Sequence, residues 1–493
     1  MGKKRKDPYI SKNFLLGSEA AEELYHEWAR DLPVIDYRCR LPPEDMADDR
    51  KFKNLSEVWL AEDRDKWRAM RLNGISERCI TGDASDWDKF QAWANTMPRC
   101  LGSPLYHLSH IELKRPFRIG DMLLNQDTAA AIWEECNERL DEPGYTARGL
   151  MEQAQVLVAC TSNDPCDNLE PHRRMARQGW HVQVRPTWHS DKTLDIEHAD
   201  TFNNWIDRLG VVSGIEISDT DALLVALRKR HDAFHNAGCR MSERNCDLSW
   251  FRDSSAAQVK QAFSRARAGK QTGGDDAAQF KSWMLLELAR MDHARGWVQQ
   301  IHVGSFRDGN SRMFRMLGTD AGFDFIGSQD VVLPLLRLLD ALDLTDQLAK
   351  TLITVADPRG SSALDTLITN FHDGAHPGKL QVGPCWSFPG SKDCWEALVG
   401  SRLGLSLPAL SIGTTSDARS FLSYSRHEYF RRNLCNLFGQ AMAHGHLPDD
   451  YELVGNMVQD LCYRNAAHYF PFDVAADHDH ALANVGSHKK KRK

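Results

Sequence analysis

Residues 34–40 of the chain read VIDYRCR, a short run rich in β-branched and apolar residues. A turn signal follows, and after it comes a longer segment with helical spacing that includes Leu55, Val58 and Trp59. This order of strand, turn and helix is the pattern of a β/α unit. It recurs with seven further candidate strands, at 156–161, 181–186, 238–242, 298–304, 352–356, 379–383 and 409–413. Eight strands alternating with helices predict an α/β fold, a parallel (β/α)8 barrel with active-site loops at the strand carboxyl ends.

The segments between the strands predict the domain organisation. We expect two helical insertions, at about 44–150 and 191–295, and the first is rich in Trp and Leu at helical spacing. The barrel with its insertions is expected to span 12–473, after a basic arm at 1–11. Residues 474–493 carry no periodic apolar face, so we expect a disordered tail that ends in a basic cluster.

The composition of the 493 residues is that of an ordinary globular enzyme. Hydrophobic residues make up 42% and charged residues 26%, which excludes a disordered, collagenous or coiled-coil chain. No apolar run approaches the roughly 18 residues that span a bilayer, so we expect no membrane insertion and a cytoplasmic location. Twelve cysteines occur without a CxxC pair, which predicts reduced, buried thiols and excludes a structural zinc finger.

Basic residues are concentrated at both ends of the chain, at Lys3–Lys6 and Lys489–Lys493. The rest is strongly acidic, since these clusters hold nine of the 61 Lys and Arg residues, against 68 Asp and Glu. An acidic body argues against nucleic-acid binding by the folded part. The clusters match short nuclear-import signals, which predicts nuclear entry in a eukaryotic host; the other interpretation is that they are solubilising or added tails.

Six longer segments carry a family resemblance. They read FKNLSEVWL (52–60), KWRAMRLNG (66–74), TGDASD (81–86), LYHLSHIELKRPF (105–117), WVQQIHVG (297–304) and SDARSFLSYSRHEYFRR (416–432). Together they resemble the uronate isomerases, a branch of the amidohydrolase superfamily that interconverts aldouronates such as D-glucuronate with ketouronates such as D-fructuronate. The resemblance runs in collinear order from about 12 to 473. It implies a distorted (β/α)8 TIM-type barrel, a homo-oligomer, and a uronate sugar as the ligand of the pocket.

The resemblance also implies a divalent metal, commonly zinc, at the strand carboxyl ends. In the family, a His-x-His pair ending the first strand and an Asp ending the eighth strand hold this ion. The family's DYHCHLPP reads DYRCRLPP here, so Arg38 and Arg40 stand in place of both histidines. A guanidinium has no lone pair to give a metal and stays protonated. We therefore expect neither a bound metal nor another cofactor.

Other site positions implied by the resemblance also depart from the family, while their flanks match it. The family's DHYKWR reads DRDKWR, so Arg64 and Asp65 replace a histidine and a tyrosine that face the substrate. His189 replaces an arginine that binds substrate. Arg244 replaces the histidine of VSDH, and Ser387 replaces the second tryptophan of GWWF.

The parts of the implied site that remain are His302, Asp417, Arg419, Trp386 and the helix that bears Tyr424, Arg426 and His427. The resemblance implies that Asp417 is a metal ligand or the base that abstracts the substrate proton, and that Arg419 binds substrate. Trp386 either lines the pocket or packs in the core. His302 is either a catalytic or ligand group or a hydrogen-bonded barrel histidine. The roles of Asp417 and His302 are conditional on the altered positions around them.

Two interpretations of the arginines lead to different functions. In the first, Arg38 and Arg40 pair with Asp417 and Asp36 and fill the place of the metal, leaving a barrel that is catalytically inactive or severely impaired. In the second, the two guanidinium groups supply about the charge of one divalent ion, and the protein is an active uronate isomerase with a metal-independent or displaced site. A third possibility is a nuclear-directed binding module. The first is our leading prediction.

Overall fold

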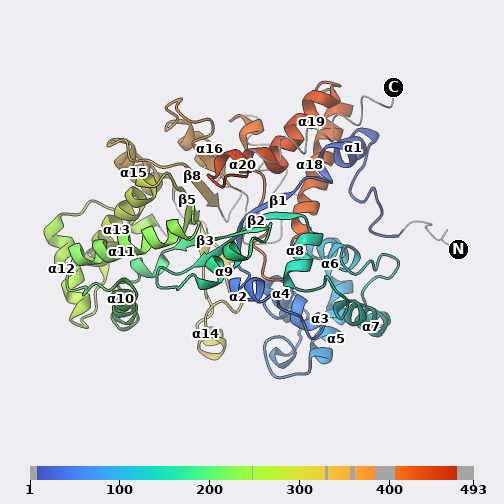
Figure 1. Cartoon of the computed structure of the whole chain (residues 1–493), viewed down its shortest axis with the longest axis horizontal. Helices are drawn as coiled ribbons and strands as arrows, with labels where there is room; N and C mark the ends of the chain where they lie inside the picture. Colours follow the sequence, from blue (N-terminus) through green and yellow to red (C-terminus); the bar gives the residue numbers. More distant parts are fainter. Residues whose placement is uncertain (1–7, 247, 328–330, 356–360, 384–405, 475–493) are drawn as a thin grey trace.

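One curled sheet of parallel strands, covered by helices, forms the centre of the molecule (Figure 1). The computed structural model describes residues 8–246, 248–327, 331–355, 361–383 and 406–474. Within these ranges the sheet has seven strands, which lie in chain order. They are β1 (Val34–Cys39), β2 (Val156–Asn163), β3 (Gln183–His189), β4 (Met241–Asn245), β5 (Val298–Val303), β8 (Thr351–Val355) and β9 (Leu380–Val382). The predicted α/β barrel-type fold is confirmed.

Every neighbouring pair in this sheet is parallel, so the carboxyl ends of all its strands meet at one rim, which we call the mouth. All residues of β1, β5 and β8 are buried. Burial on both faces explains why β8 reads as a nearly continuous apolar run, whereas β1 and β5 also carry polar side chains that are buried. Strand β4 begins three residues later than predicted, because Gly238 adopts a left-handed turn conformation with φ of 96°.

The predicted eighth strand at 409–413 is wrong. A short 3-10 helix (Pro408–Leu410) begins this segment, and Gly413 and Asp417 have φ of 73° and 45°, which interrupts extended backbone. The chain still closes the barrel, since Asp417 N–H donates to Arg38 O at 3.1 Å and Arg40 N–H donates to Ala418 O at 2.7 Å. Irregular backbone therefore joins β9 to β1 and places Asp417 beside the end of β1.

Helices between β1 and β2 form a lobe on one side of the sheet (Figure 1). Trp59, Phe90 and Trp93 are buried at its centre, and the rings of Trp59 and Trp93 meet edge to face at 6.4 Å. The helices of this lobe are α2 (Pro43–Ala47), α3 (Leu55–Trp59), α4 (Arg64–Leu72), α5 (Asp86–Thr96), α6 (Pro104–Lys114), α7 (Ala129–Leu140) and α8 (Ala147–Gln153).

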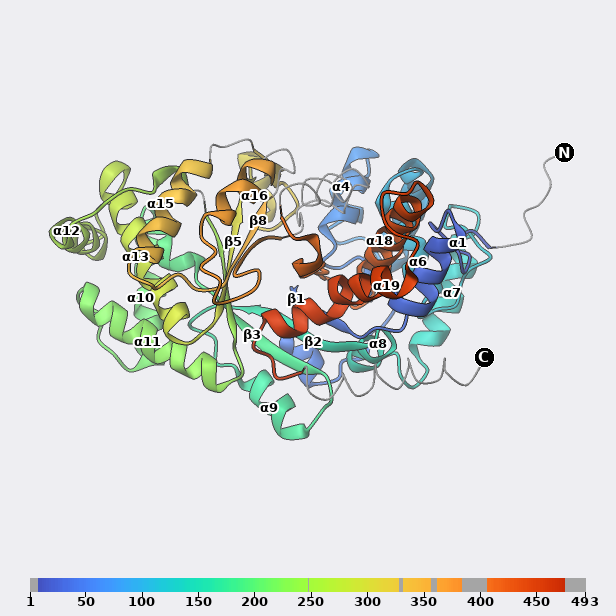
Figure 2. The same ribbon diagram turned by 90° about the horizontal axis from the view of Figure 1, so that it is seen from above.

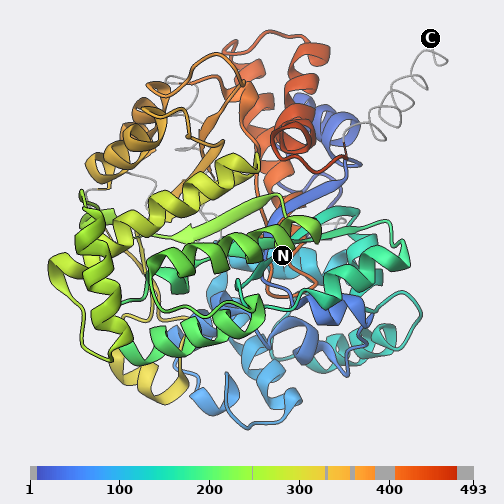
Figure 3. The ribbon, with the colours of Figure 1, turned by 60° about the vertical axis from the view of Figure 1, so that its left-hand side comes forward.

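The helices between β2 and β5 cover the outer face of the strands, where Figure 3 shows them in green. Side chains of Asp219 and Ser255 cap the first turns of two of them. These helices are α9 (Glu170–Gln178), α10 (Ala199–Ser213), α11 (Thr220–Asn236), α12 (Ala256–Arg267) and α13 (Gly274–Ala294).

Helices from the N-terminal and C-terminal parts of the chain pack together, where α1 (Glu19–Glu23) lies beside α18 and α19 (Figure 2). Gly439 allows this close approach, because a Cβ there would lie 2.4 Å from the Ala21 nitrogen. The remaining helices are α14 (Ser311–Leu317), α15 (Val332–Asp343), α16 (Ser361–Thr369), α18 (Ser425–Ala443), α19 (Tyr451–Gln459) and α20 (Asn465–Tyr469). None of the helices in the described ranges is both long and apolar enough to cross a bilayer.

An apolar layer within the sheet supports the polar residues of the mouth. Met241 of β4 and Val298 of β5 belong to one buried cluster with residues of β1, β2 and β8. Glu243 follows Met241 by two residues and His302 follows Val298 by four. Each polar side chain therefore lies on the same face of the sheet as the apolar side chain before it. Both polar residues therefore lie above the apolar layer, nearer the carboxyl ends of the strands.

Candidate functional site

Two arginines from β1 reach across the mouth to a glutamate of β4. Arg38 Nε donates to Glu243 Oε2 at 3.0 Å, and Arg40 Nη1 donates to Glu243 Oε1 at 2.9 Å. The side chains of Arg38 and Glu243 are almost completely buried, with 3% and 1% exposed. Both guanidinium groups therefore share one buried carboxylate.

Asp417 is the second carboxylate of this cluster. Its Oδ1 lies 3.2 Å from Arg38 Nη1 and 3.6 Å from Arg40 Nε. Two cations thus alternate with two anions, and we call Arg38, Arg40, Glu243 and Asp417 the arginine–carboxylate cluster. Burial raises the pKa of the Asp417 carboxyl, but Arg38 and then Arg40 outweigh burial and hold it below its usual value. Burial likewise opposes the ionised form of Glu243, yet Arg40, a hydrogen bond with His302 and Arg38 hold the pKa of Glu243 well below its usual value.

The predicted partner Asp36 has other contacts. Thr415 Oγ1 donates to Asp36 Oδ1 at 2.7 Å, and the Ser416 backbone N–H donates to the same oxygen at 2.8 Å. Asp36 therefore holds the segment that carries Asp417, while Glu243 is the carboxylate that the structure brings to the arginines.

Glu243 is the site residue that sequence reasoning missed. The predicted strand at 238–242 ends at Ser242, so it does not include Glu243. A useful signal was present, because a charged residue two positions after Met241 shares the face of a buried apolar side chain. Such a residue needs a partner of opposite charge, and Arg38 and Arg40 are cations near the end of another predicted strand of the same barrel.

His302 lies against the same carboxylate. Its Nε2 is 3.5 Å from Glu243 Oε2, and its side chain is 1% exposed. Burial, followed by the charge of Arg38, lowers the pKa of His302 to about 4. The imidazole is therefore neutral near pH 7 and lies beside the arginine–carboxylate cluster.

The first turn of α4 lies over the cluster and forms ion pairs of its own. Arg64 contacts Asp320 and lies 3.4 Å from Asp324 Oδ2, while Arg426 Nη2 lies 2.9 Å from Asp65 Oδ2. A cavity of about 40 Å³ remains in the mouth. Its lining residues are Asp63, Arg64, Asp65, Arg68, Asp324, Asp417, Arg419, Ser423 and Arg426. This volume is close to the share of one water, about 30 Å³ in the liquid, and is far below the roughly 300–1,000 Å³ of typical ligand pockets.

His189 and Arg244 each contact a carboxylate that does not belong to the arginine–carboxylate cluster. His189 Nε2 lies 2.9 Å from Asp191 Oδ2, at the carboxyl end of β3. Arg244 is fully buried and turns to the opposite face of β4 from Glu243, where it contacts Asp292 of α13 and lies 3.3 Å from Ser190 Oγ. The structure therefore does not bring Arg244 into the arginine–carboxylate cluster.

Several predicted residues lie outside the described ranges. They are Trp386, Ser387 and the basic clusters Lys3–Lys6 and Lys489–Lys493.

Among the described residues of the mouth, the arginine–carboxylate cluster does not fit a divalent metal. Guanidinium nitrogens have no lone pair for a metal, and here they occupy the space between the only two carboxylates of the cluster. Across the described residues, no group of three or more His, Cys, Asp or Glu side chains is arranged to hold a metal ion. The chemistry of the donor set, four groups of alternating charge, excludes the ligand arrangement of a zinc site here.

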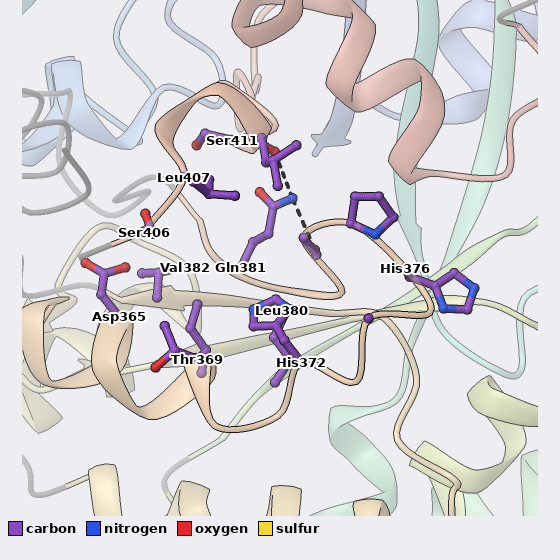
Figure 4. Close-up of a pocket in the computed structure, with 15 residues that line it drawn as sticks. Asp365, Thr369, His372, His376, Leu380, Gln381, Val382, Ser406, Leu407 and Ser411 are labelled. Carbon is purple, nitrogen blue, oxygen red and sulfur yellow. Dashed lines mark hydrogen bonds between the residues drawn. The ribbon is translucent and has the colours of Figure 1, made fainter. Parts of the chain in front are cut away.

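A larger cavity lies elsewhere in the molecule, between the end of α16, β9 and residues 406–411 (Figure 4). It measures about 640 Å³ and is lined by His372, His376 and Gln381, among others. Gln381 donates to Leu410 O at 3.0 Å, which ties this wall together. Of the site residues predicted from the sequence, none of those that the structure describes lines this cavity.

Both the sequence and the fold of this chain are similar to those of known proteins. A family model described as glucuronate isomerase matches residues 6–470. A uronate isomerase of Cellvibrio japonicus is 44% identical over 467 residues, 94% of this chain and 99% of that protein. One from Bacteroides thetaiotaomicron is 42% identical over 466 residues, again covering 94% and 99%. The crystal structure of uronate isomerase from Thermotoga maritima superimposes with a TM-score of 0.87 at 28% identity, covering 94% of this chain and 99% of that one.

Proposed function

This chain belongs to the uronate isomerase family, and we propose that its barrel has lost most or all isomerase activity. One observation carries the proposal. Arg38 and Arg40 lie between Glu243 and Asp417, where the family's metal would be held. The protein retains the scaffold of an aldose–ketose isomerase, while two of its own arginines fill the space between Glu243 and Asp417.

The first requirement of the reaction is a base that removes the C2 proton of the uronate. Asp417 is the retained candidate. Arg38 and Arg40 favour its ionised form and lower its pKa, so it attracts a proton less strongly than a free carboxylate. Asp417 is therefore a poor base for a weakly acidic C–H bond.

The second requirement is an electrophile that stabilises the enediolate. Arg38 and Arg40 carry the positive charge, but Glu243 and Asp417 balance it within about 3.6 Å. The cluster is neutral as a whole, whereas a divalent ion bound in an open site would present unbalanced charge to the substrate. A developing enediolate would have to displace a fixed carboxylate to gain either arginine.

Proton return and substrate space are also affected. Asp65, at the position of a family tyrosine, is paired with Arg426, and Arg64 is paired with Asp320 and Asp324. Both groups are engaged by other side chains of the protein. Between α4 and Asp417, the described residues leave a cavity of about 40 Å³, which is smaller than a hexuronate.

Steady-state conversion of D-glucuronate, with and without added zinc, tests the proposal. The relative from Cellvibrio japonicus, assayed under the same conditions, is the positive control. Electrostatic stabilisation and proton transfer each contribute about 10²-fold or more, so we expect kcat/KM at least about 10⁴-fold below that of the relative. A kcat/KM close to that of the relative would overturn the proposal and would show that the arginines replace the metal.

A further inference from the structure

A cavity of about 390 Å³ lies at the amino ends of β1 and β2, away from the mouth. Val34, the first residue of β1, and Gln155, which precedes β2, both line it. Helices α6, α8 and α18 also contribute residues to its wall, and α6 packs against α18 (Figure 2). We call it the amino-end cavity. The described residues that line it are all different from those that line the cavity of about 40 Å³ in the mouth.

Part of the wall of the amino-end cavity is apolar. Leu150, Phe421 and Leu422 line it and belong to one buried hydrophobic cluster. Its volume lies within the roughly 300–1,000 Å³ of typical ligand pockets. The side chains of Arg30 and Asp31 at its edge are 51% and 63% exposed, so a ligand can reach the cavity from solvent there. The amino-end cavity therefore has the size and the surface to take an apolar group.

Arg431 of α18 is a cation buried in this wall, with 4% of its surface exposed. Its Nη1 donates to Leu32 O and its Nη2 donates to Pro33 O, both at 2.7 Å. Both acceptors are uncharged backbone carbonyls. Among the described residues, no carboxylate oxygen lies within 4.0 Å of the Arg431 guanidinium, and Glu428 acts on its charge from a longer distance. A buried charge is stabilised by a close partner of opposite sign, so an anion near Arg431 would be favourable.

The carboxylates and the other arginines that line the amino-end cavity already have close partners. The pairs are Asp31 with Arg30, Glu428 with Arg115 and Arg432, and Glu112 with Lys66. Arg431 therefore differs from Arg30 and Arg115, which also line the cavity but each have a carboxylate beside them. A ligand that carries a carboxylate would complete the same arrangement at Arg431.

We propose that the amino-end cavity binds a small organic acid with an apolar body, whose carboxylate contacts Arg431. A guanidinium has more N–H donors than the two that Leu32 O and Pro33 O accept, so donors remain for a carboxylate. The apolar body would lie against Leu150 and Phe421, which removes apolar surface of both from water. The inference adds a second binding site to the molecule, and it does not depend on whether the barrel has lost isomerase activity.

Calorimetric titration of the full chain with 3-phenylpropionate tests the proposal. Its neutral amide, 3-phenylpropanamide, has the same apolar body and nearly the same size, so the difference in Kd measures the contribution of charge. Ala154→Phe places a bulky side chain in the cavity from the end of α8. Ala257→Phe is the matched control, because Ala257 lies exposed on α12. Arg431→Gln removes the buried cation.

We expect the wild type to bind 3-phenylpropionate with a Kd of about 1 mM or below, and the amide at least about tenfold more weakly. Ala154→Phe should raise the Kd of the acid at least about tenfold, and Ala257→Phe should leave it unchanged. Arg431→Gln should make the Kd values of the acid and the amide equal. If Arg431→Gln does not fold, because it loses its bonds to Leu32 and Pro33, Ala154→Phe still locates the site.

Any of four results would overturn the proposal. The wild type could fail to bind 3-phenylpropionate, or it could bind the acid and the amide with equal Kd. A folded Ala154→Phe variant could keep the wild-type Kd for the acid. Lastly, a folded Arg431→Gln variant could keep the preference for the acid over the amide.

Discussion

Replacing Arg38 and Arg40 by histidine (Arg38→His, Arg40→His; the His-x-His variant) should create a zinc site in the mouth. The two positions are two residues apart on one strand and both side chains reach Glu243 and Asp417 in the wild-type protein. Neutral imidazole and carboxylate are zinc ligands, whereas guanidinium is not. We expect about one tightly bound zinc ion per chain in the variant, as in an intact site, and none in the wild type.

The structure also predicts how the stability of the His-x-His variant changes. Without zinc, Glu243 and Asp417 lose the cations that neutralise them, and leaving a buried charge without its partner costs about 3–5 kcal/mol. Zinc at 100 times its Kd should return about 2.7 kcal/mol of unfolding free energy. The wild type should gain nothing from zinc, because its arginines already occupy the space between the carboxylates.

Zinc content after gel filtration and urea unfolding with and without zinc measure both effects. The matched control is Arg38→Gln with Arg40→Gln, which removes the same charges but offers no imidazole. The control should lose stability similarly and bind no zinc. A His-x-His variant that is folded but neither retains zinc nor is stabilised by it would refute the placement of these two positions around Glu243 and Asp417.

Three further expectations concern catalysis and pH. The His-x-His variant alone should remain a poor isomerase. Adding Arg64→His, Asp65→Tyr and His189→Arg should raise kcat/KM by more than the product of their separate effects. Coupled assays with D-glucuronate on each combination measure this. His302 has a pKa lowered to about 4 by burial, below the 6.5 of the unfolded chain, so the unfolded chain binds its proton first as pH falls. The free energy of unfolding measured with urea should therefore fall by up to about 3 kcal/mol from pH 7 to pH 4. In His302→Gln, the free energy of unfolding should depend less on pH over this range. The depressed pKa of Glu243 stabilises the fold above the unfolded value of about 4.3, and this contribution disappears as pH falls below it; Glu243→Gln should remove that acid dependence in the same measurement.

The strands of the barrel were predictable because they are short runs rich in apolar and β-branched residues, such as β8, that alternate with segments of helical spacing. The eighth strand was not, since its apolar run at 409–413 carries no sign of the left-handed conformations at Gly413 and Asp417. Local pattern cannot report backbone that is fixed by side-chain hydrogen bonds to a distant strand, as Thr415 and Ser416 make with Asp36.

The sequence predicted those features of the candidate site that depend on a single segment, and it did not predict contacts between segments far apart in the chain. The loss of lone pairs at Arg38 and Arg40 follows from residue chemistry alone. Their pairing with Glu243 does not, because it depends on which face of β4 each residue occupies. The same geometry separates Arg244 from its neighbour Glu243 and gives it to Asp292 on the outer helix layer. Asp320 comes from a loop far along the chain, and nothing local marks it as a partner of Arg64.

The most direct test of the central claim is proton NMR of D-glucuronate in D₂O with the wild-type protein. Removal of the C2 proton is the first step of isomerisation, so its exchange for deuterium reports the base even if no product is released. We predict neither D-fructuronate nor C2 exchange above the protein-free rate, at a concentration where the Cellvibrio japonicus relative brings the sample to equilibrium. Product formation or C2 exchange at a rate close to that of the relative would contradict the claim that the arginine–carboxylate cluster has disabled the site.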